Sequence, residues 1–481
     1  MISVLGVASE IFPLVKTGGL ADVVGAMPAA LKRYNIDLRT LVPGYPKVMA
    51  ALGSGEALRT YDDLFGGGAT LVAGKAAGLD LIVLDAPHLF DRPGNPYLGP
   101  DGKDWPDNWR RFAALSLAAA DIGLGKVPSF VPAVLHPHDW QAAMSPVYLR
   151  FAGGRAKSVL TVHNLAFQGN FPLAIFAELR LPPEAFSLHG IEYYGGVGFL
   201  KGGLQFADVI TTVSPTYAEE ITTPASGMGL DGLLRARRAV LRGIVNGVDT
   251  DVWNPATDPH LVARYGPGRL KRRAENKREV ERRFALESGD GMIFAVVSRL
   301  TWQKGMDLLA ASVDTLTANG ARLAVLGSGD AAVEDLFRVA AAVHHGRVGV
   351  ITGFDEPLSH LLQGGADAIV LPSRFEPCGL TQFYGLRYGC VPVVARVGGL
   401  ADTIIDANDA AVSAGVATGI QFFPVDAAGL DAGLKRGLRL HADPAAWESL
   451  QKRGMKHDVS WEKSAARYAD IYKSLAVGGR A

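Results

Sequence analysis

Short apolar runs rich in β-branched residues recur along this chain, and each ends in a turn-forming or polar residue before a helical pattern begins. Those in the first half run from ISVLGVAS at 2–9 to VITTVSP at 209–215, and those in the second half from MIFAVVSRL at 292–300 to VPVVAR at 391–396. Continuous apolar strands that alternate with helices are typical of parallel sheets covered on both faces. Two such sets predict two doubly wound α/β domains.

The length of 481 residues also favours more than one domain. The strand–helix alternation lapses over about 254–290. We therefore predict an N-terminal domain over 1–245 and a second domain over 246–456, with a hinge near 246–256. Residues 457–481 are expected to form an amphipathic helix that packs back toward the N-terminal domain through Trp461, Ala465, Tyr468, Ile471 and Tyr472.

The overall charge argues against nucleic acid or an anionic membrane as a partner. Lys+Arg and Asp+Glu both total 48, and in the charged segment at 270–283 acidic residues interleave with basic ones. That segment is predicted to be a solvent-exposed helix face. There is no basic leader and no apolar run as long as the roughly 18 residues of a membrane span. Cys378 and Cys390 fit neither a disulfide framework nor a zinc site, which predicts a cytoplasmic protein; Cys378 is expected to be a small buried apolar residue.

The pentapeptide GGLAD occurs twice, at 18–22 and at 398–402. Each copy follows an apolar strand and opens a helical pattern. Paired glycines allow a ligand to approach the backbone, and the positive end of the following helix favours an anion or a hydroxyl oxygen. One interpretation is that each domain presents a glycine turn to a shared cleft. The other is two ordinary helix starts.

Further polar residues follow the predicted strands. Lys16 lies before the first glycine turn, and Arg299 and Lys304 lie in the stretch SRLTWQKG after the first strand of the second half. Together these cations are typical of a clamp for a diphosphate, whose leaving charge they would stabilise. Asp139, His163 and Asn164 could bond to sugar hydroxyls, although a single histidine is often structural. Glu376 could bind hydroxyls or balance an oxocarbenium-like centre.

Seven motifs carry a family resemblance, in the order KTGGLADVVGAMPAAL, HDW, TVHNLAFQG, GIVNGVD, SRLTWQKG, PSRFEPCGLTQ and VGGLADT. They resemble bacterial glycogen synthases and plant starch synthases over residues 1 to about 475. The resemblance implies the GT-B architecture, two Rossmann-like domains facing each other across a deep cleft. It implies a retaining glucosyltransferase that transfers glucose from ADP-glucose to the non-reducing end of an α-1,4-glucan and releases ADP. It implies neither a metal nor pyridoxal phosphate.

The resemblance also implies roles for particular residues. The catalytic group is expected to be Asp139, His163, Arg299, Lys304 and Glu376. The donor-binding group is expected to be Lys16, Gly18, Gly19, Asp22, Asn246, Ser298, Phe354, Leu380 and Thr381. Tyr97 and Asn164 are expected to contact donor or acceptor. Within these groups, Arg299 and Lys304 would hold the diphosphate and Phe354 would stack on adenine. Asp139, Asn246 and Glu376 would bind glucose, with the His163 carbonyl near the anomeric carbon.

Two mechanisms of retention stay open. Many retaining relatives have a second glutamate eight positions after the first, but Tyr384 stands at that offset from Glu376. Without a second carboxylate, we favour front-face attack, in which the departing phosphate takes the acceptor's proton, over a carboxylate nucleophile. A glycogen phosphorylase, a sugar-nucleotide epimerase and a non-catalytic glycan-binding module are the competing functions. The sequence does not predict the oligomeric state.

Overall fold

The computed structural model describes residues 1–478, which form two compact units. Unit 1 comprises Met1–Gly247 and the C-terminal segment that starts at Trp461, and unit 2 comprises Val248–Ser460. The boundaries lie two and four residues beyond the expected ones, after 245 and after 456. Unit 2 starts where the amide of Val248 donates to the carbonyl of Val459 at 2.9 Å. Residues 479–481 of the predicted third segment lie outside the described residues.

Unit 1 is built on a nine-stranded sheet that is parallel except at β4, which runs antiparallel to both neighbours. From β1 the chain winds outward in one direction, then returns to the other side of β1 at β6 and winds the opposite way. The sequence patterns above predict neither β3, which has no buried residue, nor β4, in which three of eight residues are buried. The strands in sheet order are β12 (Leu241–Gly243), β11 (Val209–Thr212), β7 (Lys157–Val162), β6 (Val134–Pro137), β1 (Ile2–Val7), β2 (Ile36–Pro43), β5 (Leu79–Asp85), β4 (Ala69–Ala76) and β3 (Glu56–Tyr61).

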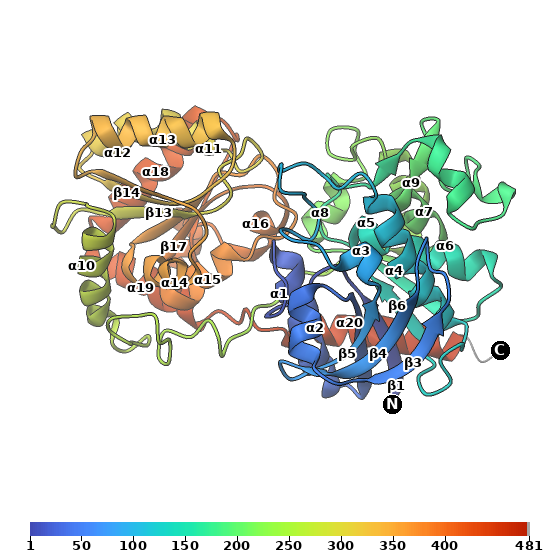
Figure 1. The fold of residues 1–481 in the computed structure, drawn as a ribbon. Helices are drawn as coiled ribbons and strands as arrows, with labels where there is room; N and C mark the ends of the chain where they lie inside the picture. The colour runs from blue at the N-terminus through green and yellow to red at the C-terminus, as the bar shows by residue number, and fades with distance from the viewer. Residues whose placement is uncertain (479–481) are drawn as a thin grey trace. The chain divides into compact units, whose positions relative to one another are not determined.

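Helices cover both faces of this sheet (Figure 1). Successive residues of β1 point to opposite layers, as the two-residue period of a strand requires: Val4 packs with α1 and α20, and Leu5 packs with α4. The predicted stripe of the C-terminal helix is buried here, apart from the half-buried Ile471. The first face is covered by α1 (Gly19–Lys32) and α20 (Glu462–Gly478). The second face is covered by α4 (Asn108–Gly123), α5 (Asp139–Ala142), α6 (Met144–Phe151) and α7 (Phe199–Phe206).

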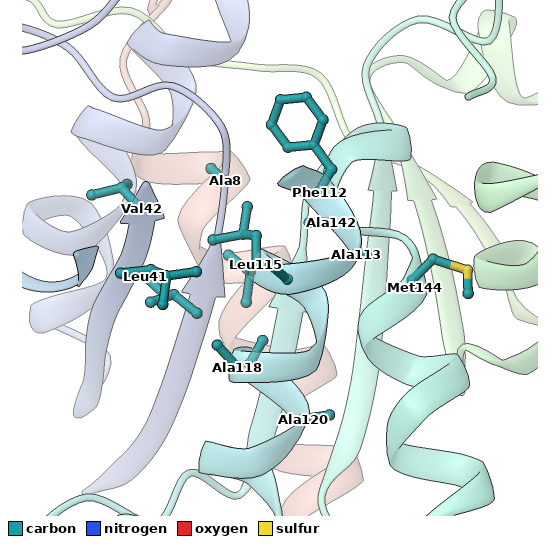
Figure 2. Packing of buried hydrophobic residues seen from close by; sticks show 14 of the residues in the cluster. Ala8, Leu41, Val42, Phe112, Ala113, Leu115, Ala118, Ala120, Ala142 and Met144 are labelled. Atoms are coloured by element: carbon teal, nitrogen blue, oxygen red, sulfur yellow. The ribbon is translucent and has the colours of Figure 1, made fainter. Parts of the chain in front are cut away.

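Alanines let α4 lie close to the strands. Ala113, Ala118 and Ala120 are fully buried, and larger side chains such as Leu115 and Leu41 fill the space around them (Figure 2). A small three-stranded sheet lies outside the main one, in the order β8 (Asn170–Phe171), β10 (Gly196–Gly198) and β9 (Glu192–Tyr193). The remaining elements of unit 1 are α2 (Pro46–Leu52), α3 (Pro87–Phe90), η1 (Leu173–Glu178), η2 (Pro183–Ala185), α8 (Pro215–Glu220), α9 (Asp231–Ala236) and η3 (Arg238–Val240).

Unit 2 has a six-stranded, fully parallel sheet in the order β15 (Val348–Thr352), β14 (Arg322–Gly327), β13 (Ile293–Val297), β16 (Ala368–Leu371), β17 (Val391–Ala395) and β18 (Ile420–Phe422). One face is covered by α11 (Met306–Ala311), α12 (Val313–Ala318), α13 (Ala331–Val343) and α18 (Ala427–His441) (Figure 1). The other face carries η4 (Leu270–Arg272), α10 (Arg273–Arg283), α14 (Glu356–Gly365), α15 (Thr381–Tyr388) and α19 (Pro444–Lys456), and α16 (Gly398–Thr403) and α17 (Asp409–Ser413) follow β17. Two doubly wound α/β units are thus confirmed. No helix among residues 1–478 is long and apolar enough to span a bilayer.

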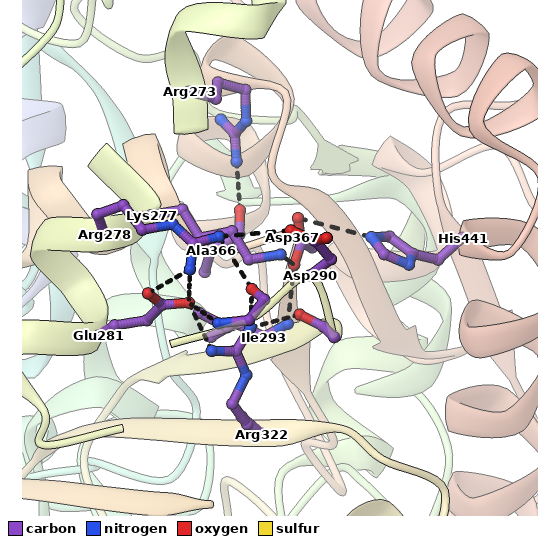
Figure 3. A network of polar contacts seen from close by, with 12 residues as sticks. Arg273, Lys277, Arg278, Glu281, Asp290, Ile293, Arg322, Ala366, Asp367 and His441 are labelled. Carbon is purple, nitrogen blue, oxygen red and sulfur yellow. Dashed lines mark hydrogen bonds and ion pairs between the residues drawn. The ribbon is translucent and has the colours of Figure 1, made fainter. Parts of the chain in front are cut away.

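The expectation of a solvent-exposed face is wrong for half of the charged helix α10. Arg273, Lys277 and Glu281 are buried against the sheet. Figure 3 shows the resulting network. Lys277 Nζ donates to Asp367 Oδ2 at 2.8 Å, and Arg322 donates to Glu281 Oε1 at 2.5 Å. Because these partners lie far away in the sequence, the local charge pattern could not predict them.

We expect Asp367→Asn to destabilise unit 2 by about 3 kcal/mol, because it leaves Lys277 buried without its counter-charge. Burial opposes ionisation of Asp367, but the His441 hydrogen bond and the Lys277 charge lower its pKa below the usual value. This contribution is therefore complete above the unfolded-state pKa of about 4, and it is lost as the pH falls further. Urea unfolding at pH 7 and at low pH measures both effects. Glu448→Gln, which removes an exposed pair with Lys452, should change nothing measurable.

Candidate active site

Polar side chains predicted to bind sugar follow neighbouring strands of unit 1. Asp139 lies just beyond β6, and His163 and Asn164 follow β7 directly. The winding direction of the chain reverses beside β6, between it and β1. Ligands of open parallel α/β sheets bind beyond the carboxyl ends of strands at such a reversal. The structure therefore brings these three residues to the edge where a ligand is expected.

Asp139 has an unusual backbone conformation and an unusual carboxyl group. Its φ of 55° lies in the left-handed region, which is uncommon for a residue with a side chain. Its Oδ1 accepts from the backbone N–H of His163 at 2.6 Å. Burial raises the pKa of Asp139 to about 7, although the backbone N–H groups of His163 and Asn164 act in the opposite direction. The carboxyl group therefore titrates near neutral pH.

His163 is the last of three histidines in contact. The rings of His136 and His138 lie 4.2 Å apart between centres, and His138 Nδ1 is hydrogen-bonded to His163 Nε2 at 3.0 Å. The hydroxyl of Tyr472, from α20, lies 2.6 Å from His136 Nδ1. Burial lowers the pKa of His136 and of His163 to about 3, and it lowers the pKa of His138 as well. All three rings are therefore neutral at pH 7, and His163 can form hydrogen bonds without carrying charge.

The first glycine pair forms an open helix N-terminus. Gly18 is the extended N-cap of α1, which starts at Gly19, and both glycines are exposed. A Cβ on Gly18 would meet no heavy atom within 4 Å. Lys16 Nζ donates to Asp22 Oδ1 at 2.9 Å, so the two predicted charged residues of this loop form an ion pair. The loop thus combines the N-terminus of a helix with a cation, and both favour an anion nearby.

Glu10 organises this loop and is absent from the predicted set. Only 3% of Glu10 is exposed, and its carboxylate accepts hydrogen bonds from the backbone N–H groups of Thr17 and Gly18 and from the Thr17 hydroxyl. The hydroxyl of Tyr97 donates to the same carboxylate and lies 2.8 Å from the hydroxyl of Ser9. Tyr97 thus supports the loop through Glu10. The signal in the sequence is a carboxylate directly after the first strand, although by pattern alone it only interrupts an apolar run.

Asn246 has an unmet hydrogen-bonding group. It is 6% exposed, and its Oδ1 has no hydrogen-bond partner within residues 1–478. A buried polar atom in this state costs about 1–3 kcal/mol. Asn164, by contrast, uses its Oδ1 to accept from the backbone N–H of Ala166 at 3.0 Å. Asn246 is therefore prepared to accept a hydrogen bond from a hydroxyl group of a ligand.

Unit 2 brings Lys304 and Glu376 into direct contact at its own reversal of winding, between β13 and β16. Lys304 Nζ donates to Glu376 Oε2 at 2.5 Å, and the hydroxyl of Ser373 donates to the same oxygen at 3.0 Å. The Lys304 and Glu376 side chains are 18% and 8% exposed. A cation and a carboxylate from loops 72 residues apart in sequence are thus fixed side by side.

Two contacts lock these loops together. A Cβ on Gly305 would lie 1.9 Å from the carbonyl oxygen of Pro372, so only glycine allows the loops to come this close. Arg374 donates two hydrogen bonds to the carboxylate of Asp307, each at 2.7 Å. These neighbours of the ion pair determine its position, so the residues around Lys304 and Glu376 have structural roles that need no ligand.

The other unit 2 residues that are predicted to bind the donor lie at strand ends or at the start of a helix. Arg299 is exposed and makes no side-chain hydrogen bond or ion pair with any described residue, whereas the Ser298 hydroxyl bonds to its neighbour's carbonyl. Leu380 is the N-cap of α15, and Thr381 is its first residue. Phe354, after β15, is 76% exposed. Each side chain or amide lies at a strand end or helix start with groups still available to a ligand.

Comparison with known proteins identifies the family. The starch synthase catalytic domain family matches residues 3–236, and glycosyl transferases group 1 matches residues 277–448. Glycogen synthase 1 of Rhizobium meliloti (strain 1021) is 59% identical over 480 residues, covering 99% of this chain and 100% of the relative. The glycogen synthase of Mesorhizobium japonicum is 59% identical over 477 residues, covering 98% and 99%. This chain belongs to the glycogen synthase family.

A solved structure agrees with this family assignment. The catalytic domain of starch synthase IV from Arabidopsis thaliana, bound to ADP and acarbose, matches with a TM-score of 0.87 and 29% identity over 99% of each chain. The resemblance predicted from the motifs is therefore confirmed, as is the GT-B class of this glycogen synthase-family chain.

The glycines of the second GGLAD copy are buried, whereas those of the first are exposed. Gly398 and Gly399 are buried, and a Cβ on Gly399 would lie 2.4 Å from the Cα and the carbonyl oxygen of Cys378. The N–H of Gly399 donates to the carbonyl oxygen of Glu376 at 3.0 Å. The interpretation that each domain presents a glycine turn to a ligand is therefore wrong for this second copy. Its Gly399 instead supports the backbone that carries Glu376. Cys378 is buried, as predicted.

The two copies should lose different amounts of stability when a glycine is replaced by alanine. Gly399→Ala should lower the free energy of unfolding by about 2–3 kcal/mol, because the added Cβ has no space beside Cys378. Gly18→Ala should lower it by less than about 1 kcal/mol, the cost of a poorer N-cap. Urea unfolding of both variants measures the contrast. Equal losses would mean that the two turns have the same structural role after all.

Because its pKa is raised, Asp139 should lower the free energy of unfolding at neutral pH. Its folded-state pKa of about 7 lies above the unfolded value of about 4, so raising the pH between these values ionises only the unfolded chain and lowers the stability. Asp139→Asn keeps the acceptor for the His163 N–H and should be more stable by about 1–2 kcal/mol at pH 8, with no gain at pH 4. Unfolding midpoints across this range provide the measurement, and a gain independent of pH would contradict the assignment.

Proposed function

We propose that this chain transfers glucose from ADP-glucose, with retention of configuration, to the non-reducing end of an α-1,4-glucan and releases ADP. Membership of the glycogen synthase family supports glucosyl transfer to a glucan. The ADP in the starch synthase IV structure supports an adenine nucleotide as the leaving group. The observation that carries the proposal is the contact between Lys304 and Glu376 at the strand ends of unit 2. Arg299, in the same loop as Lys304, is exposed and makes no side-chain hydrogen bond or ion pair with any described residue.

Unit 2 is proposed to bind the nucleotide. Arg299 and Lys304 would hold the diphosphate, since charged hydrogen bonds to phosphate oxygens are among the strongest in proteins. The backbone of Leu380 and Thr381 lies at the start of α15, where the helix dipole favours negative charge. Ser298 would add a hydroxyl at the end of β13. The exposed ring of Phe354 is suited to stack on adenine.

The glucose is proposed to bind to Asp139, Asn246 and Glu376. Asn246 fits this role because its buried Oδ1 lacks a donor that a sugar hydroxyl would supply. The neutral ring and the carbonyl of His163 would lie at the reacting face. Lys16 and the amides of Gly18 and Gly19 are proposed to contact the donor near its phosphates, with Asp22 orienting Lys16 through their ion pair. Tyr97 and Asn164 would contact donor or acceptor.

The proposed step breaks the bond between glucose C1 and the oxygen of the distal phosphate, and it forms a bond from C1 to the acceptor's O4. The departing phosphate oxygen takes the O4 proton, so no protein base is needed. Lys304 and Arg299 stabilise the charge that develops on this oxygen. Glu376 is held by Lys304 and Ser373, and Glu10 by four backbone or hydroxyl donors, which supports front-face attack over a carboxylate nucleophile.

The function is tested by measuring ADP release from ADP-glucose with and without glycogen, alongside UDP-glucose and in the presence of EDTA. We expect release that depends on glycogen, is faster with ADP-glucose, and persists in EDTA, because cationic side chains are proposed to take the place of a divalent metal. Glycogen binding without ADP release would indicate a non-catalytic module. Epimerised nucleotide sugar formed without glycogen would indicate an epimerase, and phosphate-dependent activity with cofactor absorbance would indicate a phosphorylase.

Lys304→Gln should lower kcat in this assay by roughly 10²–10³-fold, because it removes a positive charge from the leaving phosphate. The KM for ADP-glucose should change less than kcat. Lys452→Gln removes an exposed lysine of α19 in the same unit and is the matched control, with unchanged kinetics. A Lys304→Gln variant that unfolds at the wild-type urea midpoint yet keeps wild-type kcat would contradict the assigned role.

A further inference from the structure

We infer that unit 1 carries a surface subsite for the glucan chain, formed by an aromatic patch of Phe167, Tyr193, Tyr194 and Met228. The inference rests on the proposed function, because it names where the acceptor polymer is held beyond the reacting glucose. The patch is unusually apolar for its exposure: Tyr194 is 84% exposed, Phe167 51% and Met228 38%. Contiguous exposed apolar side chains mark binding surfaces more often than isolated ones do.

Hydrogen bonds and a ring contact bring the members of the patch together although they come from three segments. The Tyr193 hydroxyl donates to the carbonyl of Met228 at 3.3 Å, and Gln168 Nε2 donates to the same carbonyl at 3.0 Å. The rings of Tyr193 and Tyr194 lie 4.7 Å apart between centres, at 75° to each other. The patch is therefore one surface with fixed aromatic geometry.

The backbone is strained at this surface. Tyr194 has a φ of 49° and Met228 a φ of 48°, both in the left-handed region that bulky side chains rarely adopt. Neither residue uses that conformation to bury its side chain, since both side chains are exposed. Strain that persists without a gain in packing is typical of positions that present a side chain for function.

The patch continues directly from the candidate active site. The loop that begins with His163 and Asn164 reaches Phe167 three residues later, and the N–H of Phe167 donates to the Asn164 carbonyl at 3.3 Å. The same loop enters β8, which pairs with β10, and β10 pairs with the strand that contains Tyr193. A linear polymer whose end lies at His163 can therefore extend along this surface.

The chemistry of the surface fits a glucan better than a protein partner or an anion. Aromatic faces carry partial negative charge and attract the weakly positive C–H groups on the faces of a glucose ring. Amide groups border the rings, with Asn170 Nδ2 donating to Gln168 Oε1 at 3.2 Å. Of the nearby charged side chains, Glu192 accepts from the N–H of Gly195, and Asp231 is paired with Arg235 at 2.7 Å. Rings with polar neighbours and no excess of positive charge suit a neutral, hydroxyl-rich chain better than phosphate.

Tyr194→Asn tests this inference, because asparagine tolerates a left-handed backbone and removes only the ring. In native gels containing glycogen but no nucleotide, we expect the variant to bind glycogen at least fivefold more weakly than wild type. Tyr194→Trp keeps an aromatic face and should stay within about twofold of wild type. Val131→Ala, an exposed apolar residue beside the start of β6, is the matched control and should be unchanged.

Kinetics separate this inference from the proposed function. Tyr194→Asn should raise the KM for glycogen at least fivefold and leave ADP release with maltotriose within about twofold, since a short acceptor does not reach the patch. Wild-type glycogen binding by Tyr194→Asn would overturn the subsite while leaving the function intact. Weakened binding by that variant, together with no ADP release by wild type, would support the subsite and refute the function. Self-association that Tyr194→Asn abolishes, with glycogen binding unchanged, would assign the patch to a second copy and overturn the inference.

Discussion

The reversal of winding in each parallel sheet is the constraint on which the candidate site depends. At β1 and β6 in unit 1, and at β13 and β16 in unit 2, the chain leaves adjacent strand ends toward opposite helical layers. No crossover connection then covers the strand ends between them. Polar residues placed directly after those strands therefore lie at an edge of the sheet that no crossover helix covers. Asp139 and Glu376 both lie in loops of this kind.

Neighbouring residues, not the ligand-binding groups themselves, set the geometry of these loops. Glu10 binds the backbone before α1, and the Arg374–Asp307 pair and Gly305 hold the loops that carry Lys304 and Glu376. A charge-stabilising site works only when its groups are already oriented, since reorganising them during the reaction would consume part of the stabilisation. Residues that never contact substrate therefore matter for the site as much as those assigned to it.

The sequence predicted the architecture because apolar strands followed by helices admit few arrangements. Most of the residues that it proposes for the site directly follow those strands. The sequence-based predictions were wrong where the role of a residue depends on partners far away in the sequence. The two GGLAD peptides are identical, yet only contact with Cys378 makes Gly399 structural. The charged residues of α10 have the pattern of a solvated helix. One side of this helix is nevertheless buried, where Lys277 pairs with Asp367, 90 residues later in the chain. Glu10 resembled only an interruption of an apolar run.

Asp139 and Asp367 are two buried carboxylates whose pKa values shift in opposite directions. Burial disfavours the ionised form of both. At Asp367, the His441 hydrogen bond and the Lys277 charge more than compensate, so the pKa falls and the charge stabilises the fold. At Asp139, two backbone N–H groups do not compensate, so the pKa rises to about 7 and the left-handed backbone adds strain. A fold that needed Asp139 only for stability would supply a cation, and the missing stabilisation is what a bound substrate can provide.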